Sequence, residues 1–263
     1  MNCSNIEDIV IEEKLGEGWK SNVFAGYFHG RKVAVKVVFY SEEQSESCTE
    51  DHQESWFCFD EPRVEILYEI SLHHQLNHPS IVRMLGYCAR DPDNWPIRDD
   101  PVVKNGILSV SDFGELFDKE AERNFTASLA ISLELLDMMD YFVNSPIGPV
   151  VFDDSWSDNL RLVDGHLKIT DIESSWSTEP RCEDSDDCEY DVECVEGECK
   201  GSNAKTMRDY TQRYIRPWLA PNNSPKYKRE LKTINNLLDD EFVTFTQLVN
   251  VIQELKNKVL EEM

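Results

Sequence analysis

Alternating hydrophobic and polar positions dominate the first forty residues of the chain. Residues 9–40 alternate or are rich in β-branched side chains, most clearly over Val33–Val38, and Gly30 interrupts the pattern. Alternation sends successive side chains to opposite faces of a sheet, so we expect three antiparallel strands joined by two turns. Strand-like segments recur at Met84–Ala89 and Ile107–Ser111, which brings the predicted sheet to five strands.

Helical spacing of apolar residues follows the meander and fills most of the second half. Val64–Leu76 carries apolar residues among charges and stops before His78-Pro79, which predicts one helix. From Asn124 apolar residues fall three or four apart until Ser145-Pro146, the stripe of a second helix. Further helices are expected at Ala204–Leu219, Lys226–Leu238 and Phe245–Leu260, and short strands at Gly148–Phe152, Leu160–Val163 and Leu167–Thr170.

This order of elements predicts an α+β protein with two lobes. The first lobe has an antiparallel sheet with one helix, and the second is mainly helical. We treat the 263 residues as one domain, with an N-lobe over about 9–111, a hinge over 112–118 and a C-lobe over 119–263. The segment Arg90–Lys104 is rich in Pro, Asp and Asn and is expected to be a surface loop.

Two motifs in the first half have the residues that phosphate binding requires. Gly16 and Gly18 lie within Leu15–Val23, between two strands, where a missing side chain lets the backbone approach phosphate oxygens. Such a hairpin alone is more often simply a turn. Thirteen residues after Val23, however, Lys36 ends the run Val-Ala-Val-Lys on an apolar strand. A lysine in that place suits the α- and β-phosphates of ATP.

A lysine on an apolar strand loses its hydration unless it meets an anion, so we expect a carboxylate partner on the following helix. Glu69, ten residues before Pro79, is our choice. Glu65 lies one helical turn earlier on much the same face and is the alternative. Either residue is also compatible with a solvated surface charge.

Acidic and amide residues recur at a defined spacing in the second half. Asp154 and Asn159 have the D-x-x-x-x-N spacing, which offers a carboxylate to a substrate hydroxyl and an amide to a metal ion. Asp171 lies seventeen residues after Asp154 and follows a hairpin with the turn Asp164-Gly165. In a chain with 51 Asp and Glu residues a single acidic residue is most often surface decoration, so the order and spacing carry the argument.

In their order and spacing these motifs resemble those of protein kinases. The resemblance implies Asp154 as the catalytic base, Asn159 and Asp171 as ligands of Mg²⁺ or Mn²⁺, and ATP as the phosphate donor. A literal Asp-Phe-Gly at 112–114 precedes the catalytic loop and falls at the hinge, where its backbone is expected to face adenine. The residues assigned to nucleotide binding are Leu15, Gly16, Gly18, Val23, Ala34, Lys36, Glu69, Asp112 and Gly114.

Several segments beyond the general kinase motifs are distinctive: Cys48-x9-Cys58, Leu85–Cys88, Ser145–Gly148, Leu162–Lys168 and a late cysteine cluster. In these segments, and from about Ile11 to Leu260, the chain resembles the vertebrate lonesome kinase-like family. Members of that family are secretory-pathway kinases that phosphorylate tyrosine on extracellular proteins. The resemblance therefore implies protein substrates with an accessible tyrosine, and a glycosylated phosphoprotein that is secreted or resides in the Golgi lumen.

The chain departs from the usual kinase pattern at several points. No Lys or Arg lies between Asp154 and Asn159, where a cation often stabilises the transferring phosphate. No Ala-Pro-Glu follows the hairpin. Phe152-Asp153 stands where kinases usually have His-Arg before the catalytic Asp, and Ser21 stands at the third glycine of the loop. The motif that begins with Asp171 ends in Glu173. A pseudokinase that binds ATP or a protein partner is therefore the alternative to an active enzyme.

Retention of all four catalytic and nucleotide-binding positions, Lys36, Asp154, Asn159 and Asp171, favours the enzyme. A calcium-binding or adhesion module over Asp184–Glu193 has little support, because this acidic run lacks the mid-loop glycine of an EF-hand.

The charge of the chain narrows the class of partner. With 26 Lys and Arg against 51 Asp and Glu the formal net charge is −25, which repels phosphate-rich polymers, so a nucleic-acid partner is not expected. No apolar stretch approaches the roughly 20 residues of a membrane helix, and we expect no membrane-spanning segment. We interpret the acidity as a source of solubility, with attraction of basic substrate segments as the alternative.

Cysteines indicate an oxidising compartment. Four of the eight lie between Cys182 and Cys199 in an acidic loop, and their wide spacing favours cross-links over zinc, which usually needs C-x-x-C pairs. We predict two disulfides among these four, with the pairing left open, and a Cys48–Cys58 pair. Sequons at Asn2, Asn124 and Asn222 are compatible with secretion, although Met1 begins no signal-like segment.

Overall fold

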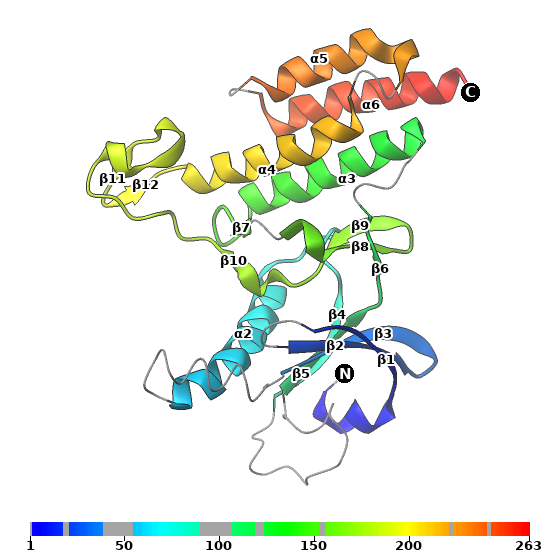
Figure 1. The fold of residues 1–263 in the computed structure, drawn as a ribbon, viewed down its shortest axis with the longest axis vertical. Coiled ribbons are helices and arrows are strands. Elements are labelled where there is room, and N and C mark those ends of the chain that lie inside the picture. The colour runs from blue at the N-terminus through cyan, green and yellow to red at the C-terminus, as the bar shows by residue number, and fades with distance from the viewer. Residues whose placement is uncertain are drawn as a thin grey trace. The chain divides into compact units, whose positions relative to one another are not determined.

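The computed structural model describes residues 2–17, 21–38, 55–89, 107–118, 124–152, 156–220, 224–240 and 243–263. The chain divides into two compact units (Figure 1). Unit 1 consists of Met1–Glu115 with Thr170–Glu173, and unit 2 of Leu116–Ile169 with Ser174–Met263. The short segment Thr170–Glu173 thus belongs to the unit built from the first half of the sequence.

A five-stranded sheet in the order β1-β2-β3-β5-β4 forms the centre of unit 1. Neighbouring strands are antiparallel throughout, which confirms the predicted meander and the two later strands. The strands are β1 Ile9–Glu17, β2 Ser21–Phe28, β3 Arg31–Val38, β4 Met84–Ala89 and β5 Ile107–Asp112. The helix α2, Ser55–Gln75, begins earlier than the predicted Val64. The apolar residues of its first turns, Trp56–Phe59, are consecutive instead of three or four apart, and Pro62 follows them, so the sequence gives no helical spacing there.

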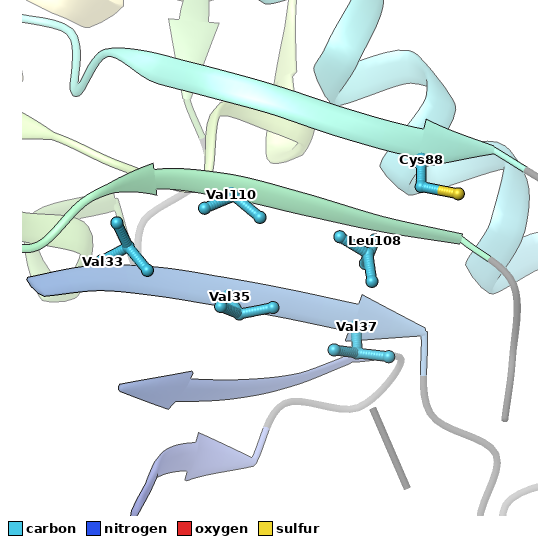
Figure 2. Packing of buried hydrophobic residues seen from close by; sticks show 6 residues of the cluster. All are labelled: Val33, Val35, Val37, Cys88, Leu108 and Val110. Carbon is cyan, nitrogen blue, oxygen red and sulfur yellow. The ribbon is translucent and has the colours of Figure 1, made fainter. Parts of the chain in front are cut away.

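Strand β3 sends alternate side chains to the two faces of this sheet. Figure 2 shows the valines of one face with Cys88, Leu108 and Val110, and all six residues of the cluster, including Val33, Val35 and Val37, are buried. The next residue along, Val38, packs instead with Ile66 and Ile70 of α2. Lys36 lies two residues before Val38 and so points to the face that α2 covers.

An unpredicted disulfide fastens the N-terminal segment to the sheet of unit 1. Cys3 lies in the 3-10 helix η1, Cys3–Asp8, and bonds to Cys88 of β4 across 85 residues of sequence. In the chain-entropy description, closing a loop of this length stabilises a fold by about 4–5 kcal/mol. The sequence gives no local signal for this pair, because neither cysteine has its partner nearby along the chain.

Four helices form most of unit 2. They are α3 Phe125–Val143, α4 Ser202–Trp218, α5 Lys228–Leu238 and α6 Phe245–Glu261. Helix α3 packs against α4 and α6. Asn124 caps α3 by accepting a hydrogen bond from the Ala127 N–H at 2.8 Å, which confirms the predicted start of this helix.

A tight hairpin precedes the segment that carries Asp171. Strands β8, Leu160–Val163, and β9, His166–Ile169, pair through a turn in which Asp164 and Gly165 have φ of 54° and 82°. Glu134 of α3 accepts a hydrogen bond from the Leu167 N–H at 2.7 Å and holds the hairpin to the helix. The predicted hairpin is confirmed.

Shorter elements complete the description. The predicted strand Gly148–Phe152 reduces to β7, Val151–Phe152, which pairs with β10, Ser175–Trp176. The remaining strands are β6 Glu115–Leu116, β11 Cys194–Val195 and β12 Glu198–Cys199. The other 3-10 helices are η3 Trp156–Asn159, η4 Ile172–Ser174, η5 Ser185–Asp187, η6 Glu189–Asp191 and η7 Pro225–Tyr227.

The late cysteine loop is cross-linked as predicted. Its two disulfides are Cys182–Cys194 and Cys188–Cys199, which resolves the pairing that the sequence left open. The four sulfur atoms are therefore not thiolates available for zinc. Cys48 of the predicted Cys48–Cys58 pair lies outside the described residues, so this pair stays a prediction. Among the helices that the structure describes, none is both long enough and apolar enough for a bilayer crossing.

Candidate functional site

Lys36 is the centre of a buried ionic cluster in unit 1. Its Nζ lies 3.2 Å from Oε2 of Glu69 in α2 and donates hydrogen bonds to Asp171 and Glu173. Glu69 is thus one of the carboxylates that meet Lys36, as we expected of a lysine on an apolar strand. The lysine is 8% exposed, so its charge is balanced by protein groups more than by water.

Local structure explains how two acidic residues close in sequence reach the same lysine. The backbone of Asp171 has φ of 61°, in the left-handed region, and the one-turn helix η4 follows. Ile172 between them is fully buried and fixes the segment. Asp171 and Glu173 therefore both face Lys36, and this arrangement makes Thr170–Glu173 part of unit 1.

The cluster holds more negative than positive charge. Burial alone would lower the pKa of Lys36, but the charges of Glu69, Asp171 and Glu173 outweigh it and raise that pKa well above its ordinary value. Burial, together with the charge of Glu69, raises the pKa of the Glu173 carboxyl to about 9. Without a further cation, Glu173 therefore carries a proton at neutral pH.

The same carboxylates fit a divalent cation. One oxygen from each of Glu69, Asp171 and Glu173 can be chosen so that all three lie within 4.8 Å of one another. Oε2 of Glu173 is buried and accepts no hydrogen bond from the residues that the structure describes, and the buried Oε2 of Glu69 lies 3.2 Å from the Lys36 ammonium. Carboxylate oxygens are ligands preferred by Mg²⁺ and Mn²⁺, so the donor set suits the cation that a kinase requires.

The predicted glycine motif lies on β1 and β2. Around Gly16 there is open space, because an added Cβ would meet nothing within 4 Å, which leaves room for a ligand close to the backbone. Gly26 differs, since an added Cβ would lie 2.8 Å from the Val10 carbonyl oxygen. Leu15 is 45% exposed, and Val23 of β2 pairs with Lys36 of β3. Gly18 is outside the described residues.

At the predicted hinge, Asp112 is already engaged by basic residues. Its carboxylate lies 2.6 Å from Nη2 of Arg31 and 3.3 Å from Nε of Arg83, and its N–H donates to the Arg83 carbonyl at 3.0 Å. A contact from Asp112 to adenine would therefore have to come from its carbonyl group. Gly114 follows β5, and Ala34 of β3 pairs with Ser111 of β5.

In unit 2, Asn159 is the last residue of the one-turn helix η3, directly before β8. A hydrogen bond of 2.7 Å from the Tyr214 hydroxyl of α4 to Oγ of the buried Ser157 holds this turn in place. Asp154, the predicted base, lies outside the described residues. The side chains that the sequence assigned to one reaction are thus divided between the two units.

Comparison with known proteins bears on the class of this fold. No family model matches the chain. It is 25% identical over 240 residues to the human extracellular tyrosine-protein kinase PKDCC, which covers 88% of this chain and 48% of that protein. It is 27% identical over 171 residues to the mouse serine/threonine-protein kinase TNNI3K, a match that covers 65% of this chain and 18% of that protein. It is 28% identical over 174 residues to the Arabidopsis wall-associated receptor kinase-like 10, a match that covers 64% of this chain and 20% of that protein.

The chain resembles a divergent PKDCC-like kinase. Its architecture, an antiparallel N-terminal sheet with one helix followed by a mainly helical region, is that of the protein-kinase fold, which confirms the predicted fold class. The chain spans about half the length of human PKDCC and about a fifth of the other two relatives. Protein kinases in general use ATP and a divalent metal ion.

Sequence reasoning missed two residues of this site. Glu173 was noted only as a departure from the kinase pattern, yet it contacts the same lysine as Asp171. Its position, two residues after the predicted metal ligand Asp171 and on a buried segment, was the available signal. His73 was not singled out either, and its Nε2 lies 3.8 Å from Oε1 of Glu69, one turn along α2.

Proposed function

We propose that this chain is an ATP-dependent protein kinase that phosphorylates tyrosine in proteins of the secretory pathway or the extracellular space. The observation that carries the proposal is the Lys36–Glu69 ion pair with Asp171 hydrogen-bonded to the same lysine. This combination joins a strand, a helix and a segment more than 130 residues away in the sequence, as 171 − 36 = 135. Simple surface ion pairs do not require such an arrangement.

Each residue has a distinct role in the proposed reaction. Lys36 contacts the α- and β-phosphates of ATP, and Glu69 keeps its ammonium group in position. Asp154 accepts the proton of the substrate hydroxyl as that oxygen bonds to the γ-phosphorus, and the bond from phosphorus to the ADP oxygen breaks. Asn159 and Asp171 would hold the divalent cation, which neutralises charge that develops on the phosphates.

Support for an oxidising compartment comes from the disulfides. Three are present among the described residues, and such bonds persist in secreted and lumenal proteins but are rare in the cytosol. One relative is named as an extracellular tyrosine-protein kinase. Tyrosine as acceptor and extracellular proteins as substrates both follow that relative, while the other relatives named above include a serine/threonine kinase.

One observation favours the second candidate, a pseudokinase that serves as a binding module. Glu173 hydrogen-bonds to Lys36, the group that should contact phosphate. ATP must displace this contact, and a chain in which Glu173 always held the lysine would transfer no phosphate.

The test uses protein purified from a secretory expression system, with ATP and either Mn²⁺ or Mg²⁺. Secreted proteins serve as substrates, and phosphotyrosine and phosphoserine are detected separately. We expect phosphotyrosine that depends on the metal ion and is absent with Asp171→Ala. Phosphoserine alone would contradict the acceptor class, and no transfer with retained ATP binding would favour the pseudokinase.

A further inference from the structure

We propose that Glu173 is itself a ligand of the divalent cation, so that Asp171 and Glu173 together form a two-carboxylate site for a hard, oxygen-preferring ion such as Mn²⁺ or Mg²⁺. The inference deepens the proposed function and rests on it for the role of the ion in phosphate transfer. Its structural content, that Glu173 binds the cation, can be tested without nucleotide.

Geometry is the first argument. The donor oxygens of Glu69, Asp171 and Glu173 lie within 4.8 Å of one another. Two oxygens bound to one ion at about 2.1 Å each are at most about 4.2 Å apart. Separations within 4.8 Å therefore match one shared ion after at most a small side-chain adjustment.

Formal charge gives the second argument. Counted as fully ionised groups, the three carboxylates contribute −3 and the Lys36 ammonium +1, and −3 + 1 leaves −2 around one lysine. A divalent cation would balance that charge. A proton on Glu173 reduces it to −1 when no other cation is bound. Burial strengthens the requirement, since the side chains of Glu69 and Glu173 are only 6% and 14% exposed, and buried charge without a partner is costly.

An unsatisfied oxygen gives a third, independent argument. Within the described part of the chain, Oε2 of Glu173 is buried without a hydrogen-bond donor, whereas Oε2 of Glu69 is buried and forms an ion pair with the Lys36 ammonium at 3.2 Å. Buried carboxylate oxygens usually accept a hydrogen bond or bind a metal ion. The Asp171 side chain is 39% exposed, so an ion has a route to the cluster from solvent.

Glu69 takes a different role in this arrangement. Its contacts with Lys36 and with Nε2 of His73 at 3.8 Å tie it to groups other than the ion. Asp171 and Glu173 instead share one short segment, and Glu173 contacts Lys36 through Oε1 while its Oε2 has no hydrogen-bond donor among the described residues. We therefore assign Glu173 to the ion and leave Glu69 as the residue that positions Lys36.

The experiment measures Mn²⁺ binding to the nucleotide-free full chain, by electron paramagnetic resonance of the free ion during titration. We compare wild type with Glu173→Gln, which keeps shape and removes charge, and with Glu173→Asp, which keeps the carboxylate. Glu13→Gln is the matched control, because Glu13 is an exposed acidic residue of the same unit. Circular dichroism verifies that each variant is folded.

We expect wild type to bind Mn²⁺, Glu173→Gln to bind at least tenfold more weakly, Glu173→Asp to fall between them, and Glu13→Gln to match wild type. Equal affinity of wild type and Glu173→Gln, or no binding by wild type, would overturn the assignment. Phosphotransfer is measured separately. If the chain binds Mn²⁺ through Glu173 but transfers no phosphate, this inference stands and the proposed function is contradicted. If the chain is an active kinase and Glu173→Gln binds Mn²⁺ as tightly as wild type, the proposed function stands and this inference is contradicted.

Discussion

Replacing Glu173 by Gln should stabilise the metal-free protein, and increasingly so as pH rises. Burial raises the pKa of this carboxyl to about 9, from an ordinary value of 4.5. Between pH 4.5 and pH 9 the Glu173 carboxyl is therefore protonated in the folded protein and ionised in the unfolded chain. For such a group stability is highest below pH 4.5 and is lost as pH rises through this window.

The size of the effect follows from the linkage of protonation to folding. Each pH unit between the two pKa values costs about 1.4 kcal/mol, so between pH 5 and pH 7 wild type should lose on the order of 3 kcal/mol from this group. Glutamine has the same shape and no charge to titrate. The variant therefore lacks this loss, and its advantage over wild type should grow from small at pH 5 to about 3 kcal/mol at pH 7.

Urea unfolding at pH 5, 6, 7 and 8, in buffer with a chelator, measures the free energy of unfolding of both proteins. Glu13→Gln serves as the control for removal of one exposed negative charge. Two results would refute the reasoning: parallel stability curves for wild type and Glu173→Gln, or a variant that is less stable than wild type at pH 7. Either result would mean that the neighbouring groups already balance the negative charge of Glu173.

Three further predictions concern the glycines, the catalytic loop and the cysteines. Gly16→Ala should weaken ATP binding with little change in the melting temperature, whereas Gly26→Ala should lower the melting temperature. The reason is that only the Cβ added at Gly26 would meet a backbone atom, at 2.8 Å. Calorimetry and ATP titration separate these effects, and a lower melting temperature of Gly16→Ala would contradict the prediction. Asp154→Asn should lower kcat more than it weakens ATP binding, since a base acts in the transition state, and an unchanged rate would point to Asp153 or to another carboxylate. Reduction should loosen the loop 182–199, where two disulfides contribute about 2–3 kcal/mol each, and unchanged hydrogen exchange there would contradict this.

Local pattern was enough to predict most elements of the fold. Alternation along β3 and the turn Asp164-Gly165 depend on neighbours in sequence, and both were found from the sequence. The stripe of α3 and its cap at Asn124 are equally local. The start of α2 was misplaced because the apolar residues before Val64, Trp56–Phe59, are consecutive and are followed by Pro62, so they give no helical period.

Long-range pairings were harder to predict. Cys3 and Cys88 are 85 residues apart, and only the sheet brings them together. The contact between Lys36 and Glu173 spans 137 residues. Known kinase spacing singled out Asp171 as a metal ligand and Glu69 as the partner of Lys36. No such pattern exists for Glu173, so its role depends on the three-dimensional arrangement.

Transfer of the γ-phosphate of isotope-labelled ATP to a protein acceptor tests the central claim most directly. Wild type, Lys36→Met and Asp171→Ala should all bind the same protein substrates, while only wild type should transfer the label, because both changes act on the nucleotide and its metal ion. Transfer at the wild-type rate by either variant, with its fold verified, would contradict the assignment of the Lys36–Glu69–Asp171 cluster as the phosphate-transfer site.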